Sequence, residues 1–185
     1  MQRSTWLKAL ALIAVLVLAF GAGVWVGFGL GQPDFRLSPM GSTELRIDGS
    51  VVVVTYSRPY VRGRVIFGEV VGYGAVWRTG ANEATALSTN VDLIIGGTEV
   101  PSGDYTLYTI PEQDRWTLIV NRQTGQWGTA YDDSQDLARI EMDVEPTNWL
   151  VELFTIRIDS AGLGAELLIE WENTRARVLI RVQDP

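Results

Sequence analysis

Two turn dipeptides, Asp48-Gly49 and Gly96-Gly97, constrain the fold of this chain most strongly. Asp-Gly and Gly-Gly suit the two-residue turns that join neighbouring antiparallel strands, and the segments on either side are short and rich in β-branched residues. We therefore predict two β-hairpins. They join Leu45–Ile47 to Ser50–Tyr56, and Val91–Ile95 to Thr98–Val100.

Further strand patterns follow at the spacing of an all-β domain. They cover Asp104–Ile110, Trp116–Asn121, Trp149–Ile158, Ala165–Trp171 and Ala176–Val182. Short strands at such intervals are typical of sandwiches and barrels. The predicted fold class is therefore all-β, an antiparallel β-sandwich of jelly-roll or immunoglobulin-like type. Beyond the N-terminal region only Asp132–Arg139 suggests a helix, and a short one.

The last two strand patterns predict a specific register. If Asn173-Thr174 is a two-residue turn, one face of the hairpin pairs acids with arginines. The expected pairs are Glu172 with Arg175, Glu170 with Arg177, and Glu166 with Arg181. Opposite charges at facing positions stabilise a strand pair, so these charges need no functional explanation.

An uncharged apolar run of 22 residues occupies Ala9–Leu30. At about 1.5 Å per residue, a helix of this length spans a hydrocarbon core of about 30 Å. Arg3 and Lys8 precede the run and Asp34 follows it, so the positive-inside rule places the N-terminus in the cytoplasm. We predict a single-pass helix in a bacterial inner membrane within residues 1–31, a linker over 32–41 and a periplasmic β domain over 42–185.

The alternative to a retained anchor is a cleaved signal peptide, with Ala19 and Gly21 at the positions that a signal peptidase reads. Apolar sequence continues through Val24–Phe28, beyond the usual length of a signal-peptide core, which favours retention of the anchor.

Small residues recur every fourth position along the predicted anchor. They are Ala19, Gly23, Gly27 and Gly31. This spacing aligns them on one helix face, as in small-xxx-small packing surfaces, whereas glycine otherwise lowers helix propensity. The face predicts packing against another membrane helix; the alternative is lipid-facing glycine with no protein partner.

Cysteine and histidine are both absent from the chain. Their absence excludes disulfides, thiol nucleophiles, Cys/His zinc sites and serine–histidine triads, so we expect neither a metal nor a cofactor. Without Arg3 and Lys8, the part after the anchor holds 13 basic and 22 acidic residues, a charge of 13 − 22 = −9. Such a charge repels nucleic acid and anionic lipid as a whole.

Against this acidic background, one stretch is locally basic. Arg58, Arg62, Arg64 and Arg78 are accompanied there by a single acid, Glu69. The stretch ends in a glycine-flanked motif with Trp77, Arg78, Asn82 and Glu83. Arginine forks and glycine-flanked backbone N–H groups favour an anion or carboxylate pocket. The structural alternative is that Arg78 and a neighbour pair with Glu83, while Trp77 and Phe67 fill the core around an irregular connection.

Three weaker patterns occur in the sequence. Glu83 with Asp132 or Asp133 would be an acid–base couple, but nothing fixes their separation. Asp132, Asp133 and Asp136 lack the ligand spacing of a calcium loop, so a solvated loop is the simpler interpretation. Four tryptophans are expected to fill the core rather than form a sugar platform; they are Trp116, Trp127, Trp149 and Trp171.

Several segments together resemble a bacterial domain-of-unknown-function family, numbered twenty-nine eleven. They are Tyr56–Pro59, Arg62–Gly68, Tyr73–Thr85, Pro101–Leu107, Ile110-Pro111 and Trp116. The resemblance covers roughly residues 38–131 and departs from the family at Val71-Gly72, where a proline commonly precedes the Tyr-Gly pair. It implies an exported, β-rich protein without an assigned activity, so no catalytic residue is carried over.

These observations favour a non-catalytic protein. The leading hypothesis is an accessory subunit of a bacterial membrane complex, for example a photosynthetic reaction-centre or light-harvesting assembly. It would pack through its anchor and dock through its β domain; the expected partners are other subunits and the bilayer, not nucleic acid. The alternative is a membrane-tethered binding module for an anionic or carbohydrate ligand.

Overall fold

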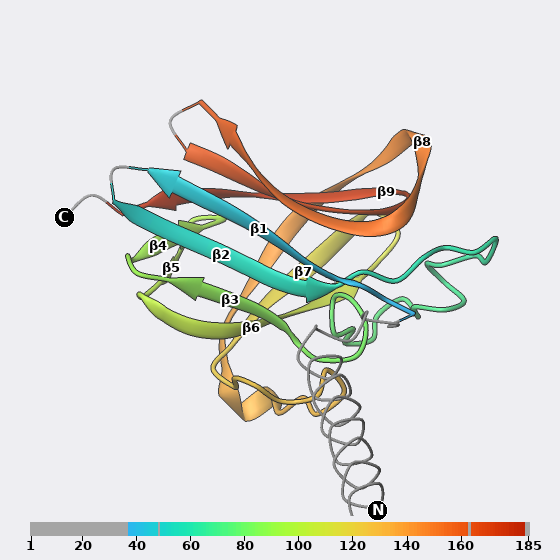
Figure 1. Cartoon of the computed structure of the whole chain (residues 1–185), viewed down its shortest axis with the longest axis horizontal. Helices are drawn as coiled ribbons and strands as arrows, with labels where there is room; N and C mark the ends of the chain where they lie inside the picture. Colours follow the sequence, from blue (N-terminus) through green and yellow to red (C-terminus); the bar gives the residue numbers. More distant parts are fainter. Residues whose placement is uncertain (1–36, 48, 163, 184–185) are drawn as a thin grey trace, which may run out of the picture. The chain divides into compact units, whose positions relative to one another are not determined.

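A computed structural model describes residues 37–47, 49–162 and 164–183, and these residues form an all-β domain (Figure 1). Its strands are β1 (Met40–Ile47), β2 (Ser50–Ser57), β3 (Thr85–Thr89), β4 (Leu93–Ile95), β5 (Thr98–Val100), β6 (Gly103–Pro111), β7 (Arg115–Asn121), β8 (Asp136–Ala161) and β9 (Gly164–Val182). These strands form one sheet in the order β1-β2-β3-β6-β7-β8-β9-β4-β5, and each pair of neighbouring strands is antiparallel. The predicted all-β antiparallel class is confirmed, and its jelly-roll or immunoglobulin-like subtype stays a prediction.

The predicted anchor and its small-residue face, from Ala19 to Gly31, lie outside the described residues. Within the part that the structure describes, no helix is long and apolar enough to cross a membrane.

Two long strands fold the sheet over itself. The first part of β8 pairs with β7, and the second part, from Thr155, pairs with the start of β9. Figure 1 shows the C-terminal end of β8 and the start of β9 lying over β1 and β2. The buried Tyr56 hydroxyl joins these layers, because it donates to the Ile156 carbonyl at 2.9 Å and accepts from the Ile156 N–H at 2.8 Å. The result is a sandwich-like domain around one core.

Both predicted hairpins are confirmed. Ile47 pairs with Ser50, and Ile95 pairs with Thr98. Gly96 and Gly97 have φ angles of 55° and 85°, a left-handed backbone that glycine adopts without steric cost. The predicted strands over 104–110 and 116–121 lie within β6 and β7.

The predicted hairpin around Asn173-Thr174 is wrong, because β9 runs without interruption from Gly164 to Val182. The strand bends at Glu172, whose φ is 54°, and keeps its partner β8 on both sides of the bend. Charge complementarity is satisfied by one pair across to β8 and by pairs within β9 instead. Arg175 binds Glu170 at 2.6 Å and Glu145 at 3.0 Å, and Arg177 lies 3.7 Å from Glu166.

Other parts of the strand prediction also need correction. Asp132–Arg139 contains one 3-10 turn, Asp133–Gln135, and β8 begins directly after it. The sequence prediction missed β3 and the first half of β8. In that half, Ile140 and Met142 are buried between exposed neighbours, so a period-two pattern was present. β3 consists largely of small and polar residues and carries no strong strand signal.

Two of the four tryptophans expected in the core are at the surface. Trp116 and Trp171 are buried, whereas Trp127 and Trp149 expose 54% and 55% of their surface. Trp127 lies in a loop, and Trp149 lies where the register of β8 against β9 shifts. The Arg175 guanidinium lies 5.5 Å from the Trp149 ring centroid, a cation–π contact at the surface.

A hydrogen-bonded network at the start of β8 is expected to lose its stabilising effect at alkaline pH. Tyr131 donates to Asp136 at 2.7 Å and accepts from Arg139 at 2.9 Å. Burial, and then the Asp136 carboxylate, raise the pKa of Tyr131 to about 12. A raised pKa means that the folded state favours the neutral phenol, so this stabilisation is complete below the unfolded pKa of 10 and is lost towards 12.

We expect the free energy of unfolding to fall between pH 10 and 12, and to fall less steeply in Tyr131→Phe. At neutral pH the variant loses a hydrogen bond to a charged group, at a cost of about 1–3 kcal/mol. Denaturant unfolding at several pH values measures both effects. Burial also raises the pKa of Tyr105 and Tyr108, so part of the fall persists in the variant. If the free energy of unfolding fell as steeply with pH in Tyr131→Phe as in the unaltered protein, the role of Tyr131 would be contradicted.

Candidate functional site

The basic stretch and the motif belong to the connection between β2 and β3, which runs along the end of the sheet as isolated bridges and turns. Main-chain bonds hold it to three other parts of the domain. Val61 N–H donates to Glu152 at 2.8 Å, Trp77 N–H to Thr109 at 2.7 Å, and the Asn82 carbonyl accepts from Gly128 at 3.0 Å. The irregular connection that the sequence suggested is therefore fixed at several points.

The centre of the motif uses an unusual backbone. Thr79, Gly80 and Asn82 have φ angles of 53°, 148° and 57°. Thr79 is fully buried; its carbonyl accepts from the Thr85 hydroxyl at 2.7 Å, and its own hydroxyl lies 3.1 Å from that of Thr109. Such positive φ angles in non-glycine residues persist where surrounding bonds hold them. The motif thus turns the chain sharply beside the core.

Five aromatic side chains form a cluster beneath the motif. They are Phe67, Trp77, Trp116, Phe154 and Trp171. The rings of Trp77 and Trp171 are nearly parallel, at 11° with centroids 5.8 Å apart, and the other contacts are edge-to-face. Trp77 therefore joins the motif to the core, as the structural interpretation expected.

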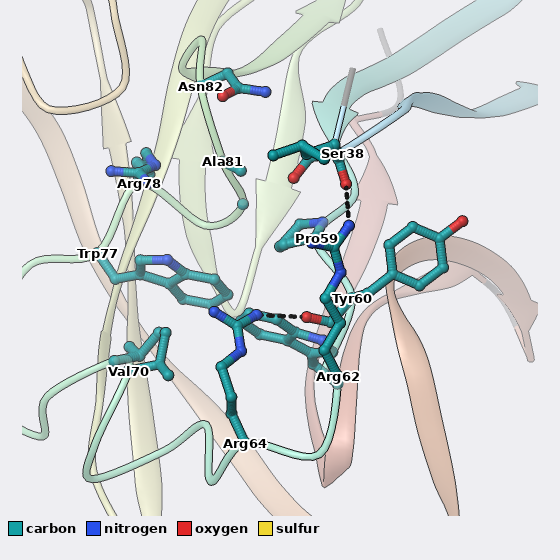
Figure 2. A pocket seen from close by; sticks show the side chains of 14 residues that line it. Ser38, Pro59, Tyr60, Arg62, Arg64, Val70, Trp77, Arg78, Ala81 and Asn82 are labelled. Carbon is teal, nitrogen blue, oxygen red and sulfur yellow. Dashed lines mark hydrogen bonds between the residues drawn. The ribbon is translucent and has the colours of Figure 1, made fainter. Parts of the chain in front are cut away.

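A pocket of about 390 Å³ opens where the motif, the basic stretch and the aromatic cluster meet (Figure 2). We call it the arginine pocket. Its lining consists of Leu37, Ser38, Pro59, Tyr60, Arg62, Arg64, Val70, Val71, Trp77, Arg78, Gly80, Ala81, Asn82 and Trp171. Three of these residues are arginines, and none is acidic.

Arg62 and Arg64 extend from one loop, with their guanidinium groups at two levels of the pocket (Figure 2). Arg62 donates from Nη2 to the Leu37 carbonyl at 3.3 Å. Arg64 donates from Nε to the Val61 carbonyl at 3.0 Å and from Nη2 to the Tyr60 carbonyl at 2.6 Å. These bonds orient both side chains but neutralise no charge. Each guanidinium keeps further N–H groups for a ligand.

Arg58, also a candidate, does not line the pocket. It donates from Nε to the Phe154 carbonyl at 3.0 Å and from Nη2 to the Thr155 hydroxyl at 2.9 Å. Its position attaches the end of β2 to β8, a structural role.

Two buried donors at the pocket lack partners. Among the described residues, neither Arg78 Nε nor Trp171 Nε1 has a hydrogen-bond acceptor. Trp171 is only 2% exposed. A buried N–H group without an acceptor costs about 1–3 kcal/mol, so such donors commonly indicate a missing partner.

The acidic candidates lie elsewhere. Glu83 accepts from the Ser57 hydroxyl at 3.3 Å and pairs through its backbone with Trp127. Asp132 caps the 3-10 turn by accepting from Ser134, and Asp136 belongs to the Tyr131 network. In the described ranges, no three acidic side chains gather as metal ligands. For Arg78, the salt bridges found between described residues include none with Glu83.

The structure therefore brings together Arg62, Arg64, Trp77, Arg78 and Asn82 in the pocket lining, which does not include Arg58 and Glu83. It adds Ser38, Tyr60, Val70 and Trp171, which sequence reasoning did not place at a site. Trp171 is distant in the sequence and reaches the pocket through β9, so no local pattern could have identified it. Tyr60 adjoins the basic stretch and could have been included.

Comparison with known proteins gives one match. The family model described as "Protein of unknown function (DUF2911)" matches residues 38–180. No curated protein and no solved structure matches the chain.

Proposed function

From the premise that this chain belongs to the DUF2911 family of proteins of unknown function, we propose that it is a non-catalytic, membrane-tethered binding module. Its ligand is an anion, which binds in the arginine pocket. The tether is the apolar segment Ala9–Leu30, and the domain faces the periplasm.

The observation that carries this proposal is the unbalanced charge of the pocket. Arg62, Arg64 and Arg78 line it without a lining carboxylate, on a chain whose net charge is −7. Guanidinium groups form strong, directional bonds to carboxylate and phosphate oxygens.

The chemistry of the lining supports binding rather than catalysis. Its ionisable groups are three arginines and Tyr60. Guanidinium groups have no acceptor atom, and the lining holds neither a carboxylate nor a histidine. The usual general bases are therefore not among the lining residues.

Replacing Arg64 with glutamine should test the proposed site. We expect Arg64→Gln to weaken anion binding about 10- to 100-fold, because a charge-assisted hydrogen bond contributes about 1.5–3 kcal/mol. Titration of the full chain in detergent with citrate, inorganic phosphate and glucuronate measures this change by calorimetry. Arg122→Gln is the matched control, since Arg122 is exposed and does not line the pocket.

Melting curves must accompany this test, because Arg64 also binds the carbonyls of Tyr60 and Val61. Arg62→Gln gives a second reading, since Arg62 is exposed and has a single such bond, to Leu37. If none of the three anions binds the unaltered protein, the proposed function is wrong.

A second candidate function is an accessory subunit of a bacterial membrane complex, for which a photosynthetic assembly is one example. Exposed apolar side chains in the same β2–β3 connection favour it. Val65, Val70, Tyr73 and Val76 expose 50%, 47%, 43% and 38% of their surface. Exposed apolar groups that gather in one segment are typical of contact surfaces. In this role the anchor packs through Ala19, Gly23, Gly27 and Gly31, and the domain docks on a larger subunit.

Purification in mild detergent at native abundance tests the second function. We expect co-purifying subunits that are lost from a Val65→Ser/Val70→Ser variant with an unchanged melting curve. A lone monomer would exclude a stable accessory role and leave the binding function untouched.

A further inference from the structure

We infer that the ligand of the arginine pocket is an anionic sugar, a pyranose ring that carries a carboxylate or phosphate. This inference rests on the binding function proposed above and names its ligand class. It follows from the size of the pocket, from its neutral polar groups and from its apolar wall.

The pocket is larger than the simplest anions. At about 30 Å³ for each water, the pocket of about 390 Å³ holds the volume of about 13 waters. Acetate or inorganic phosphate would occupy a small part of it and leave most lining groups in water. A pyranose ring with its substituents matches the available space more closely.

The neutral hydrogen-bonding groups of the pocket need donors and acceptors on the ligand in addition to its negative charge. Ser38 and Asn82 line it beside the arginines. Figure 2 shows the Asn82 amide and Ser38 on the same side of the pocket as Arg62. A fatty or aryl acid would bury these groups without partners, which costs about 1–3 kcal/mol for each group. Sugar hydroxyls act as donors and acceptors and satisfy them.

The remaining wall is apolar. Tyr60, Val70 and Trp77 supply it, and Trp77 is held in place by its stacking on Trp171. The C–H face of a pyranose is apolar while its rim carries hydroxyls, so one ring can contact this wall and the polar groups together. An inorganic anion has no apolar face to offer.

Asn82 provides the residue-specific test. Asn82→Gly removes the amide but tolerates the left-handed backbone, whose φ is 57°. The bond from Gly128 to the Asn82 carbonyl is retained. Asn173→Gly is the matched control, since Asn173 is exposed and lies outside the pocket lining.

The experiment is a tryptophan-fluorescence titration of the full chain, in an amine-oxide detergent because sugar detergents would compete. The probes are glucuronate, glucose 6-phosphate, glucose, acetate and inorganic phosphate. We expect at least one anionic sugar to bind about 10-fold or more tightly than glucose, acetate and phosphate. Asn82→Gly should weaken that sugar about 10-fold and leave acetate unchanged, whereas Asn173→Gly should change neither.

The outcomes separate the two levels of the proposal. If acetate or phosphate binds as tightly as the anionic sugars, the sugar inference is overturned and the anion-binding function stands. Equal affinity for glucose, or an Asn82→Gly variant with unchanged affinity, also overturns the inference. If no probe binds, the proposed function fails together with it.

Discussion

Replacing Trp171 with alanine is expected to lower the free energy of unfolding by about 3–5 kcal/mol. The side chain is 2% exposed, stacks on Trp77 at 5.8 Å and contacts Phe67 and Phe154 edge-to-face. Its removal leaves a cavity in the aromatic cluster, and the loss includes both the buried area and the ring contacts. Denaturant unfolding, followed by circular dichroism, measures the change.

Trp127→Ala is the matched control for this prediction, because 54% of Trp127 is exposed. We expect a loss of less than about 1 kcal/mol, as for most surface substitutions. Equal losses in the two variants would show that the aromatic cluster is not the centre of stability. The comparison also tests whether Trp127 lies at the surface, since the sequence predicts both tryptophans in the core.

The strand prediction succeeded where turn chemistry is local. Asp48-Gly49 and Gly96-Gly97 each determine a turn within two residues, so the neighbouring strand ends follow directly. Between Glu166 and Arg181 the same reasoning failed, because acids and arginines alternate along β9 and suit more than one register. The structure satisfies them across β8 at Glu145 and by local pairs along β9, an outcome that depends on tertiary contacts.

The candidate site was predicted in part for a comparable reason. The basic stretch and the motif are close in sequence, so their shared position near one pocket could be expected from composition alone. Which arginine faces the pocket could not, because that depends on β8. Arg58 is held by Phe154 and Thr155, while Arg64 is held by carbonyls of its own loop. Trp171 comes from β9 and Ser38 from the segment before β1, and no local pattern relates either residue to the motif.

Gly80→Ala is expected to lower the free energy of unfolding by about 2–6 kcal/mol, combining about 1–3 kcal/mol of backbone strain with a similar cost of overpacking. Gly80 has a φ of 148°, and a Cβ there would lie 2.8 Å from the Ser57 carbonyl oxygen and 3.7 Å from the Phe154 ring. The neighbouring atom at 2.8 Å is backbone, so it cannot move aside without distorting the end of β2.

Gly125→Ala separates the two contributions to this loss. Gly125 also has a positive φ, 75°, but a Cβ there would meet nothing within 4 Å. The free energy of unfolding of Gly125→Ala should therefore fall by only about 1 kcal/mol, the cost of backbone strain. Thermal and denaturant unfolding of both variants give the comparison. An equal loss in Gly80→Ala and Gly125→Ala would contradict this prediction. Close packing of the motif against Ser57 would then not fix the wall of the arginine pocket, and the pocket could rearrange without loss of the fold.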